Sequence, residues 1–373
     1  MTYGSHRVRV AIVHERFTEY GGSEKVVEEF HHVWPQAQIL TSVCDYSRLP
    51  PSIPPALITT SALQYLYRGR GSHARFLPAI PLAMRAMRVP DVDVVISSHH
   101  AFANQVSLGK RRTRFISYVH SPARWVWDPT MTSGEPGGRM GEAALRAFAA
   151  TYRPWDRAAA QRPHMIIANS SAVQQRVVAW WGRESVVLHP PVDTEFYHPD
   201  VSGIPREEFF LFAGRLVPYK QPEVAVEAAN RAALQLVVVG HGRCAKALER
   251  LAGPTVELRG RVSDEELRSL YQSCRALVQP GVEDFGISTV EAQACGTPVI
   301  ARRAGGALDT VADGLSGCLY DTRAATDAAR ALSKAMESFD ADAYRQELIV
   351  QHAQKFSRDR FRTRIRELVE GVP

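Results

Sequence analysis

Short apolar, β-branched runs alternate with helix-like segments along most of this chain, and this alternation limits the possible folds more than any other feature of the sequence. In the first half we predict strands, each followed by helical or loop sequence, at 8–14, 93–98, 114–120 and 165–170. Strands that alternate with helices pair in parallel, because each connection must cross over the sheet. The sequence therefore predicts an α/β fold built on a parallel sheet.

The alternation stops at proline-rich sequence without periodicity, at 189–193 and 198–205, and then restarts. The second series has predicted strands at 209–213, 234–239, 255–258, 276–279 and 298–301 and predicted helices at 221–232, 243–251, 264–272 and 286–295. A chain of 373 residues also exceeds the length over which one hydrophobic core usually grows. We predict two doubly wound, Rossmann-like domains, 1–195 and 206–351, and a charged helix at 352–373 that packs back toward the first domain.

The composition is that of a globular protein in a reducing compartment. Hydrophobic residues make up 45% of the chain and charged residues 23%, and the five cysteines form no Cys-x-x-Cys pair. No segment reaches the roughly 20 apolar residues of a membrane-spanning helix, and the apolar stretch near the N-terminus is too short for a signal peptide. These features predict a cytoplasmic protein. The formal net charge of +6 indicates an anionic partner without saying which one.

One segment is strongly basic, because residues 46–90 contain no Asp or Glu. Its arginines are Arg48, Arg68, Arg70, Arg75, Arg85 and Arg88. Between 61 and 88 the basic residues alternate with apolar and aromatic ones, a mixture that suits the surface of an anionic membrane. These are Tyr65, Leu66, Tyr67, Phe76, Leu77, Leu82 and Met84. An ordinary amphipathic helix with a solvated basic face explains the same pattern, and both interpretations stay open.

Two glycine-containing loops follow predicted strands and suit the binding of phosphate. Gly21 and Gly22 stand directly before a helix start, where free amides and the helix dipole favour an anion. Gly214 ends a strand of the second domain and is followed by Arg215 and Lys220, two cations that can share a diphosphate and stabilise its charge as it leaves. A plain turn and a solvated basic loop are the alternative interpretations.

The segment from Glu283 to Glu291 indicates a site for a sugar or a ribose. A helix starts there, and its first amides, at Phe285, Gly286 and Ile287, would be free to bind hydroxyl or phosphate oxygens. Carboxylates lie on both sides of this start, and a carboxylate can accept two hydrogen bonds side by side from a vicinal diol. Alternatively, the first glutamate only serves the helix dipole and the second is a surface residue.

His120 ends the predicted strand 114–120. A histidine in this position can bond a substrate hydroxyl or transfer a proton near neutral pH. A structural role is the alternative, and among the 13 histidines this one stands out by its location alone.

Taken in order, these motifs resemble glycosyltransferase family 4, the retaining nucleotide-sugar transferases of the GT-B fold. The resemblance covers nearly the whole chain. Its pieces are Gly21-Gly22-Ser23-Glu24, Val119-His120-Ser121-Pro122, Ala168-Asn169-Ser170, Gly214-Arg215-Leu216 with Lys220, Gly260-Arg261-Val262, the element from Glu283 to Glu291, and Ala294-Cys295-Gly296-Thr297-Pro298-Val299-Ile300. The family implies two Rossmann-like doubly wound domains that face a central cleft.

The resemblance also implies roles for the matching residues. Arg215 and Lys220, beside Gly214, would hold the donor diphosphate, and Glu283 with the amides of the helix start would hold the transferred sugar. Glu291 would bind the ribose hydroxyls. No metal and no other cofactor is required on this comparison, because the cations and the helix-start amides neutralise the leaving diphosphate.

Further roles fall on both halves of the chain. The backbone around Arg261 and Val262 would lie near the base of the donor. His120 would approach the donor sugar at the reaction centre, and the loop of Gly21 and Gly22 would lie against the donor phosphates or the acceptor. The family lacks a clear enzymic nucleophile, so we expect front-face attack, in which the departing phosphate oxygen takes the acceptor's proton.

Within the family, the segment 120–128 looks like a stretch found in mannosyltransferases that build lipid-linked bacterial polysaccharides. This likeness implies GDP-mannose as the donor and a lipid-linked saccharide as the acceptor, with a UDP-sugar as the alternative donor. A nucleotide-sugar epimerase would use the same fold and is the alternative enzyme. An oxidoreductase is disfavoured because no Gly-x-Gly-x-x-Gly follows the first strand, and no nucleic-acid partner is expected from positive charge alone.

Overall fold

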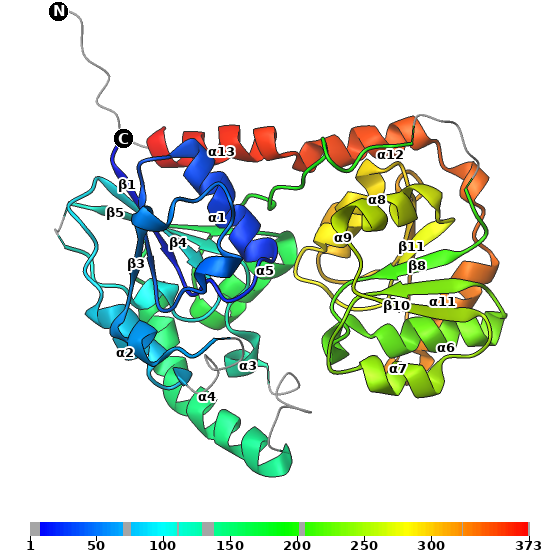
Figure 1. The fold of residues 1–373 in the computed structure, drawn as a ribbon, viewed down its shortest axis with the longest axis horizontal. Coiled ribbons are helices and arrows are strands. Elements are labelled where there is room, and N and C mark those ends of the chain that lie inside the picture. Colours follow the sequence, from blue (N-terminus) through cyan, green and yellow to red (C-terminus); the bar gives the residue numbers. More distant parts are fainter. Residues whose placement is uncertain are drawn as a thin grey trace, which may run out of the picture. The chain divides into compact units, whose positions relative to one another are not determined.

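The computed structural model describes residues 8–69, 76–109, 112–128, 138–200, 206–322 and 324–371. The chain divides into two compact units, one made of the residues up to Pro191 together with those from Phe361 on, and the other of Val192–Arg360 (Figure 1). Within the described residues, each unit has a parallel sheet with helices on both faces, so the predicted α/β class is confirmed.

The sheet of the first unit has, among the described residues, seven parallel strands in the order β3-β2-β1-β4-β5-β6-β7. They are β1 (Val10–His14), β2 (Gln38–Thr41), β3 (Ile58–Thr60), β4 (Val94–His99), β5 (Arg114–Val119), β6 (Met165–Ala168) and β7 (Val186–Val187). The central strands β1, β4 and β5 are buried along almost their whole length, which explains their apolar sequences. The sequence pattern does not predict β2, β3 or β7, which have four, three and two residues.

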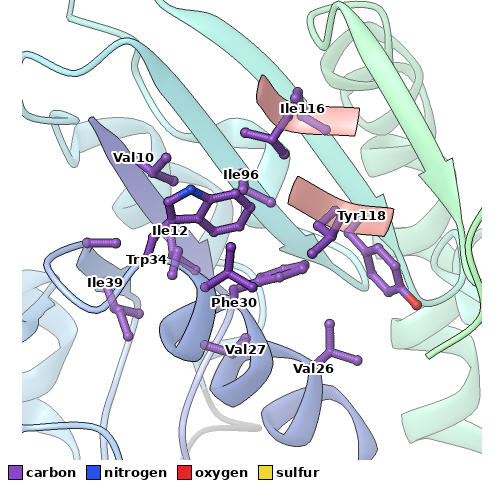
Figure 2. Close-up of a cluster of buried hydrophobic side chains, with 14 of the residues drawn as sticks. Val10, Ile12, Val26, Val27, Phe30, Trp34, Ile39, Ile96, Ile116 and Tyr118 are labelled. Atoms are coloured by element: carbon purple, nitrogen blue, oxygen red, sulfur yellow. The ribbon is translucent and has the colours of Figure 1, made fainter. Parts of the chain in front are cut away.

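Helices cover both faces of this first sheet. They are α1 (Gly22–Val33), α2 (Ile80–Ala86), α3 (Arg124–Trp127), α4 (Gly138–Ala160), α5 (Ser171–Arg176) and the C-terminal α13 (Arg358–Glu370). Figure 2 shows the core beneath α1, where Phe30 packs near Ile12, Ile96 and Tyr118. The rings of Phe30 and Tyr118 meet edge to face at 5.7 Å, and Phe361 of α13 stacks on Phe30 at 5.9 Å. The last helix therefore completes the core of the first unit.

The sheet of the second unit has six parallel strands in the part of the chain that the structure describes, in the order β10-β9-β8-β11-β12-β13. They are β8 (Phe210–Ala213), β9 (Leu236–Val239), β10 (Val256–Gly260), β11 (Ala276–Gln279), β12 (Val299–Arg302) and β13 (Gly317–Tyr320). The helices are α6 (Pro222–Ala232), α7 (Ala245–Leu251), α8 (Asp264–Ser273), α9 (Ile287–Ala294), α10 (Ala307–Thr310), α11 (Ala328–Glu337) and α12 (Gln346–Ala353).

Residues of β8 alternate between two cores, as expected for a strand buried on both faces. Phe210 and Phe212 belong to the core under α6, α7 and α11, whereas Leu211 and Ala213 belong to the core under α8 and α9. Figure 1 shows these two groups of helices on opposite faces of the sheet. The second unit is therefore doubly wound.

The boundaries of the units differ from the predicted domain boundaries. The second unit begins at Val192, whose amide donates to the carbonyl oxygen of Phe356 at 2.9 Å. Residues 352–360 belong to the second unit, where Ala353 and Phe356 are part of its core, and α13 belongs to the first unit only from Phe361 on. Residues 201–205 of the predicted linker lie outside the described residues.

Both sheets contain a point at which the chain reverses the direction in which it adds strands. In the first sheet this point lies between β1 and β4, and in the second it lies between β8 and β11. Connections that leave such a pair of strands diverge to opposite faces, which opens a crevice at the carboxyl ends where doubly wound sheets bind ligands. The residues that follow these strands are therefore candidates for a binding site.

Candidate active site

Lys220 and Glu283 meet at the switch point of the second unit. Lys220 ends a short turn that follows β8, and Glu283 lies in the loop after β11. The Nζ of Lys220 is hydrogen-bonded to Oε1 of Glu283, and Nε2 of Gln279 donates to the same oxygen at 2.7 Å. The two charged side chains are 13% and 12% exposed, so this is a largely buried ion pair.

The ion pair keeps Lys220 charged. Burial by itself lowers the pKa of Lys220, but the charge of the Glu283 carboxylate and the hydrogen bond to it outweigh burial and raise the pKa above its usual value. A full positive charge therefore stands at the carboxyl end of β8 at neutral pH.

Glycines let the two loops approach each other closely around the pair. A Cβ on Gly281 would lie 2.6 Å from Cα of Lys220 and from the carbonyl oxygen of Tyr219, so a larger residue would push the loops apart. Gly214 lies beside the same side chain, since a Cβ there would be 3.3 Å from its Nζ. Gly286, directly before α9, has a φ of 95°, a left-handed conformation that favours glycine. The geometry of the ion pair therefore depends on these glycines.

The first turn of α9, which starts at Ile287, carries two hydroxyl groups, and Thr289 lies beside Gly286 as Glu283 does. Thr289 is fully buried and Ser288 is half-buried, and in the described part of the chain neither side-chain oxygen has a hydrogen-bond partner. A buried hydroxyl without a partner costs free energy, which a ligand hydroxyl or phosphate bound here would recover. Neither residue was among the predicted ones, although hydroxyl residues in the first helical turn after a glycine are a readable signal. The Phe285 side chain packs against Phe356 at 5.5 Å, so only its backbone amide is suited to a ligand.

Arg215 lies at the same strand end as the ion pair. Its side chain is exposed, and its Nη2 donates to Oη of Tyr219 at 2.8 Å. Its charge is close enough to oppose the protonation of Lys220. The structure thus brings Arg215, Lys220 and Glu283 together at the carboxyl ends of β8 and β11.

Three further residues were predicted to bind the donor, namely Glu291, Arg261 and Val262. Glu291 is buried in α9 and accepts a hydrogen bond from Oη of Tyr271 at 3.3 Å, so it is not the surface residue of the alternative interpretation. Arg261 is exposed and Val262 is half-buried after β10, the edge strand two places from β8 in the sheet. Their contacts with ribose and base stay predictions.

His120 follows β5 and lies beside the switch point of the first unit. Its Nε2 is 2.7 Å from Oγ of Ser98, the ring of His100 stacks on it at 4.5 Å, and Tyr118 contacts it edge-on at 5.2 Å. Burial, together with the charges of His100 and His14, holds the pKa of His120 well below its usual value. His120 is therefore neutral at neutral pH and suited to hydrogen bonding rather than to charge stabilisation.

The glycine loop before α1 differs from its prediction. The amide of Gly21, expected to be free for a phosphate, donates to Oε2 of Glu24 at 3.0 Å, and the hydroxyl of Ser23 donates to the same oxygen at 2.9 Å. Oε1 of Glu24 is 3.1 Å from Nε2 of His14, at the end of β1. Burial raises the pKa of Glu24, but the hydrogen bond and charge of His14 outweigh burial and lower it to about 2. Gly22 is the first residue of α1, and its predicted contact with a ligand stays a prediction.

A cavity of about 320 Å³ lies elsewhere in the first unit, next to the amino-terminal ends of β1 and β2. Its lining includes Val10, Trp34, Pro35, Gln38 and Val92. It is lined by none of the predicted site residues, and it lies at the opposite end of the strands from the edge at which doubly wound sheets bind ligands. The cavity is therefore separate from the candidate site.

Solved structures match this chain over nearly its whole length. Sucrose-phosphate synthase from Thermosynechococcus elongatus matches with a TM-score of 0.72 over 96% of this chain and 98% of that chain, at 17% identity. HepE from Anabaena, solved in complex with UDP and glucose, matches with a TM-score of 0.68 over 98% of this chain and 100% of that chain, also at 17% identity. The chain therefore has the GT-B fold.

Family comparison agrees with the fold. Residues 20–196 match the family described as Glycosyltransferase Family 4, and residues 194–351 match the family described as Glycosyl transferases group 1. The two matches together span residues 20–351, and the chain is a retaining glycosyltransferase of the family 4 type that uses a nucleotide-sugar donor. This assignment decides against the epimerase.

Curated relatives are named D-inositol 3-phosphate glycosyltransferase. The relative from Acidothermus cellulolyticus is 29% identical over 80% of this chain and 70% of its own length. The relative from Mycolicibacterium smegmatis is 28% identical over 74% of this chain and 67% of its length, and that from Frankia alni is 30% identical over 61% of this chain and 62% of its length.

These names do not support the predicted mannosyltransferase. The structure offers a physical reason for the misleading likeness at 120–128. Trp125 in this segment stacks on Phe148 at 5.6 Å, and Trp127 donates from Nε1 to Asp156 at 2.7 Å. The aromatic residues of the segment thus serve packing within the first unit, which carries no information about the donor.

Enzymes of this family and fold are typically metal-independent. No group of three or more His, Cys, Asp or Glu side chains in the described ranges is placed to hold a metal ion. Over the same ranges, no helix has the length and apolar character needed to cross a bilayer.

Proposed function

We propose that the second unit binds the diphosphate and the sugar of the donor through Arg215, Lys220 and Glu283. The observation that carries this proposal is the buried ion pair at the β8–β11 switch point, where doubly wound sheets bind their ligands. Arg215 and Lys220 would stabilise the negative charge that grows on the leaving diphosphate. Glu283, the first amides of α9 and the unpartnered hydroxyls of Ser288 and Thr289 would hold the sugar.

Transfer with retention is proposed to occur by front-face attack. The bond between the anomeric carbon and the diphosphate oxygen breaks, and its electron pair stays with the diphosphate. The acceptor hydroxyl attacks from the same face, and its proton passes to the departing phosphate oxygen. A double displacement would need a carboxylate that is free to attack the anomeric carbon. The carboxylate of Glu283 is instead hydrogen-bonded to Lys220 and Gln279.

His120 is proposed to bond a hydroxyl of the transferred sugar. Because its ring is neutral, it would contribute a hydrogen bond and no charge. The loop at Gly22 would contact the donor phosphates or the acceptor. Glu291 would face the ribose, and the backbone of Arg261 and Val262 would lie near the base.

The names of similar proteins favour a UDP-sugar over GDP-mannose as the donor. HepE is described in complex with UDP-glucose, and the three relatives are named for inositol phosphate rather than mannose. We therefore place a UDP-sugar first and keep GDP-mannose as the competing donor.

We propose an acceptor that carries a phosphate. The relatives are named for D-inositol 3-phosphate, and the lipid-linked saccharide expected from the sequence would carry a diphosphate, so both acceptors present phosphate oxygens. The acid-free segment of the first unit provides cations for such a group, because Arg68, Arg85 and Arg88 are exposed.

A lipid-linked acceptor would be reached at a membrane surface. Exposed apolar residues in the same segment suit peripheral binding to anionic lipid, since Tyr65 is 92% exposed, Leu66 59% and Leu82 57%. Arg70 and Arg75, which belong to the predicted basic surface, lie outside the described residues. Sedimentation with phosphatidylglycerol vesicles, compared with phosphatidylcholine vesicles, tests this part of the proposal.

Thermal unfolding of the whole chain with UDP, GDP, ADP and their sugars tests the donor site. A ligand at a hundred times its Kd adds about 2.7 kcal/mol to stability, which raises the Tm of a domain of this size by roughly 5–10 °C. We expect this shift with UDP and UDP-sugars, and its loss in Lys220→Ala. A shift with GDP alone would support GDP-mannose, and no shift with any nucleotide would refute the donor site.

A further inference from the structure

We propose that His14, Glu24 and Ser98 form a relay of hydrogen bonds that fixes the tautomer of His120 and presents its Nδ1 as a hydrogen-bond acceptor. The link to a sugar hydroxyl rests on the proposed function, whereas the relay itself is visible in the first unit. Nε2 of His14 is 3.1 Å from Oε1 of Glu24, and its Nδ1 is 3.1 Å from Oγ of Ser98. The same Oγ is 2.7 Å from Nε2 of His120. These residues are between 0% and 7% exposed, so water does not compete along the relay.

The order of protons along the relay follows from counting donors and acceptors. Glu24 is ionised at neutral pH, and a carboxylate only accepts, so Nε2 of His14 must carry a proton. In the proposed relay the His14 ring is neutral and carries this one proton, so its Nδ1 is bare and accepts the hydroxyl proton of Ser98; a second proton on His14 would reverse the order. A hydroxyl has a single proton to donate, so Oγ of Ser98 must in turn accept from Nε2–H of His120. The Nδ1 of His120 is then left without a proton.

The bare nitrogen is available to a ligand. Among the described residues, no hydrogen bond uses Nδ1 of His120, and the residue as a whole is 7% exposed. The ring of His100 stacks on one side of His120 at 4.5 Å, and Tyr118 contacts it edge-on at 5.2 Å. The relay therefore sets the tautomer, and the aromatic contacts set the direction of the ring.

Glu24 also connects the relay to the loop before α1. Its second oxygen accepts from the amide of Gly21 and the hydroxyl of Ser23, so this carboxylate is held in place from both sides. His14, Glu24 and Ser98 would touch no substrate, and we regard them as positioning residues that act through His120.

The nitrogen-15 spectrum of the histidine rings tests the relay directly. It is recorded on the full chain at pH 8 without substrate, and the His120 signals are identified by their loss in His120→Asn. We expect a protonated Nε2 and a bare Nδ1 in the wild-type chain, and a mixture of tautomers in Ser98→Ala.

Ser97→Ala is the matched control for the spectrum. Ser97 lies on the same strand, is equally buried at 0% exposure, and donates to Oδ1 of Asn104 at 2.6 Å. The Ser97→Ala variant loses a comparable hydrogen bond. Because Ser97 has no link to the relay, the His120 signals should stay as in the wild-type chain. A wild-type His120 protonated at Nδ1, or equal changes in Ser97→Ala and Ser98→Ala, would overturn the relay.

Kinetics test the positioning role. Ser98→Ala should lower kcat about tenfold, equivalent to about 1.4 kcal/mol, while KM for the donor changes by no more than about twofold. Ser98→Thr, which keeps the hydroxyl, should restore most of the rate. Unchanged kcat in Ser98→Ala would overturn the role. Because the ring spectrum needs no substrate, failure of the relay and failure of the proposed function are seen in separate measurements.

Discussion

Removing one partner of the Lys220–Glu283 pair should reduce both stability and turnover, whereas removing both partners should restore stability alone. The side chains are 13% and 12% exposed, so a single substitution leaves a mostly buried charge without its counterion. Such a charge costs about 3 kcal/mol, which lowers the Tm of a domain of this size by roughly 6–12 °C. We expect this loss in Lys220→Met and again in Glu283→Gln.

The double variant Lys220→Met/Glu283→Gln has no buried charge left to compensate. The double variant should therefore lose less stability than the two single variants lose together, with a coupling free energy of about 1–3 kcal/mol. Its turnover should stay low, because the cation at the leaving group is still missing. Loss of one group that stabilises developing charge lowers kcat by about 100- to 1000-fold.

Calorimetry of the full chain and initial rates at saturating donor measure the two effects. Arg330→Met is the control, because Arg330 pairs with Asp327 at 2.8 Å on the surface of the same unit, with side-chain exposures of 63% and 36%. The control should resemble the wild-type chain in both assays. Strictly additive losses of stability, or recovery of turnover in the double variant, would refute the reasoning.

Asp156 accepts from the indole N–H groups of Trp127 and Trp181, and burial raises its pKa to about 6. The folded pKa lies above the unfolded one, so the stability this carboxyl contributes is complete below about pH 4 and is lost as the pH rises through about 6. Asp156→Asn should remove that dependence and stabilise the chain at pH 8 by up to about 3 kcal/mol; a Tm–pH profile like that of the wild-type chain would contradict this. Gly281→Ala places a Cβ 2.6 Å from Cα of Lys220 and should weaken the thermal shift with UDP, so an unchanged shift would count against the close packing.

Local sequence was sufficient for the strands that are continuous apolar runs and insufficient for β2, β3, β7 and β13. The central strands β1, β4, β5 and β8 are continuous apolar runs because both of their faces are covered, and periodicity predicts them. β7 has two residues and β13 is the sequence GCLY, so neither carries a pattern of its own. Such strands form because a neighbouring strand offers them hydrogen bonds.

Neighbouring sequence likewise indicated some features of the candidate site and missed others. A glycine at a strand end followed by cations indicated Gly214, Arg215 and Lys220 without reference to the rest of the chain. The same reasoning missed that Glu24 occupies the amide of Gly21, because the side chain folds back onto its own helix start.

The amino-acid sequence by itself determined the alternation of strands and helices, the glycine loops and the charged residues beside them, since these patterns act over a few neighbouring residues. Only the tertiary structure decided which strand ends become neighbours. Lys220 and Glu283 are 63 positions apart, and His14 and Ser98 are 84 apart, so each pairing depends on the order of strands in a sheet. Burial at those strand ends then influences which of these groups carry charge.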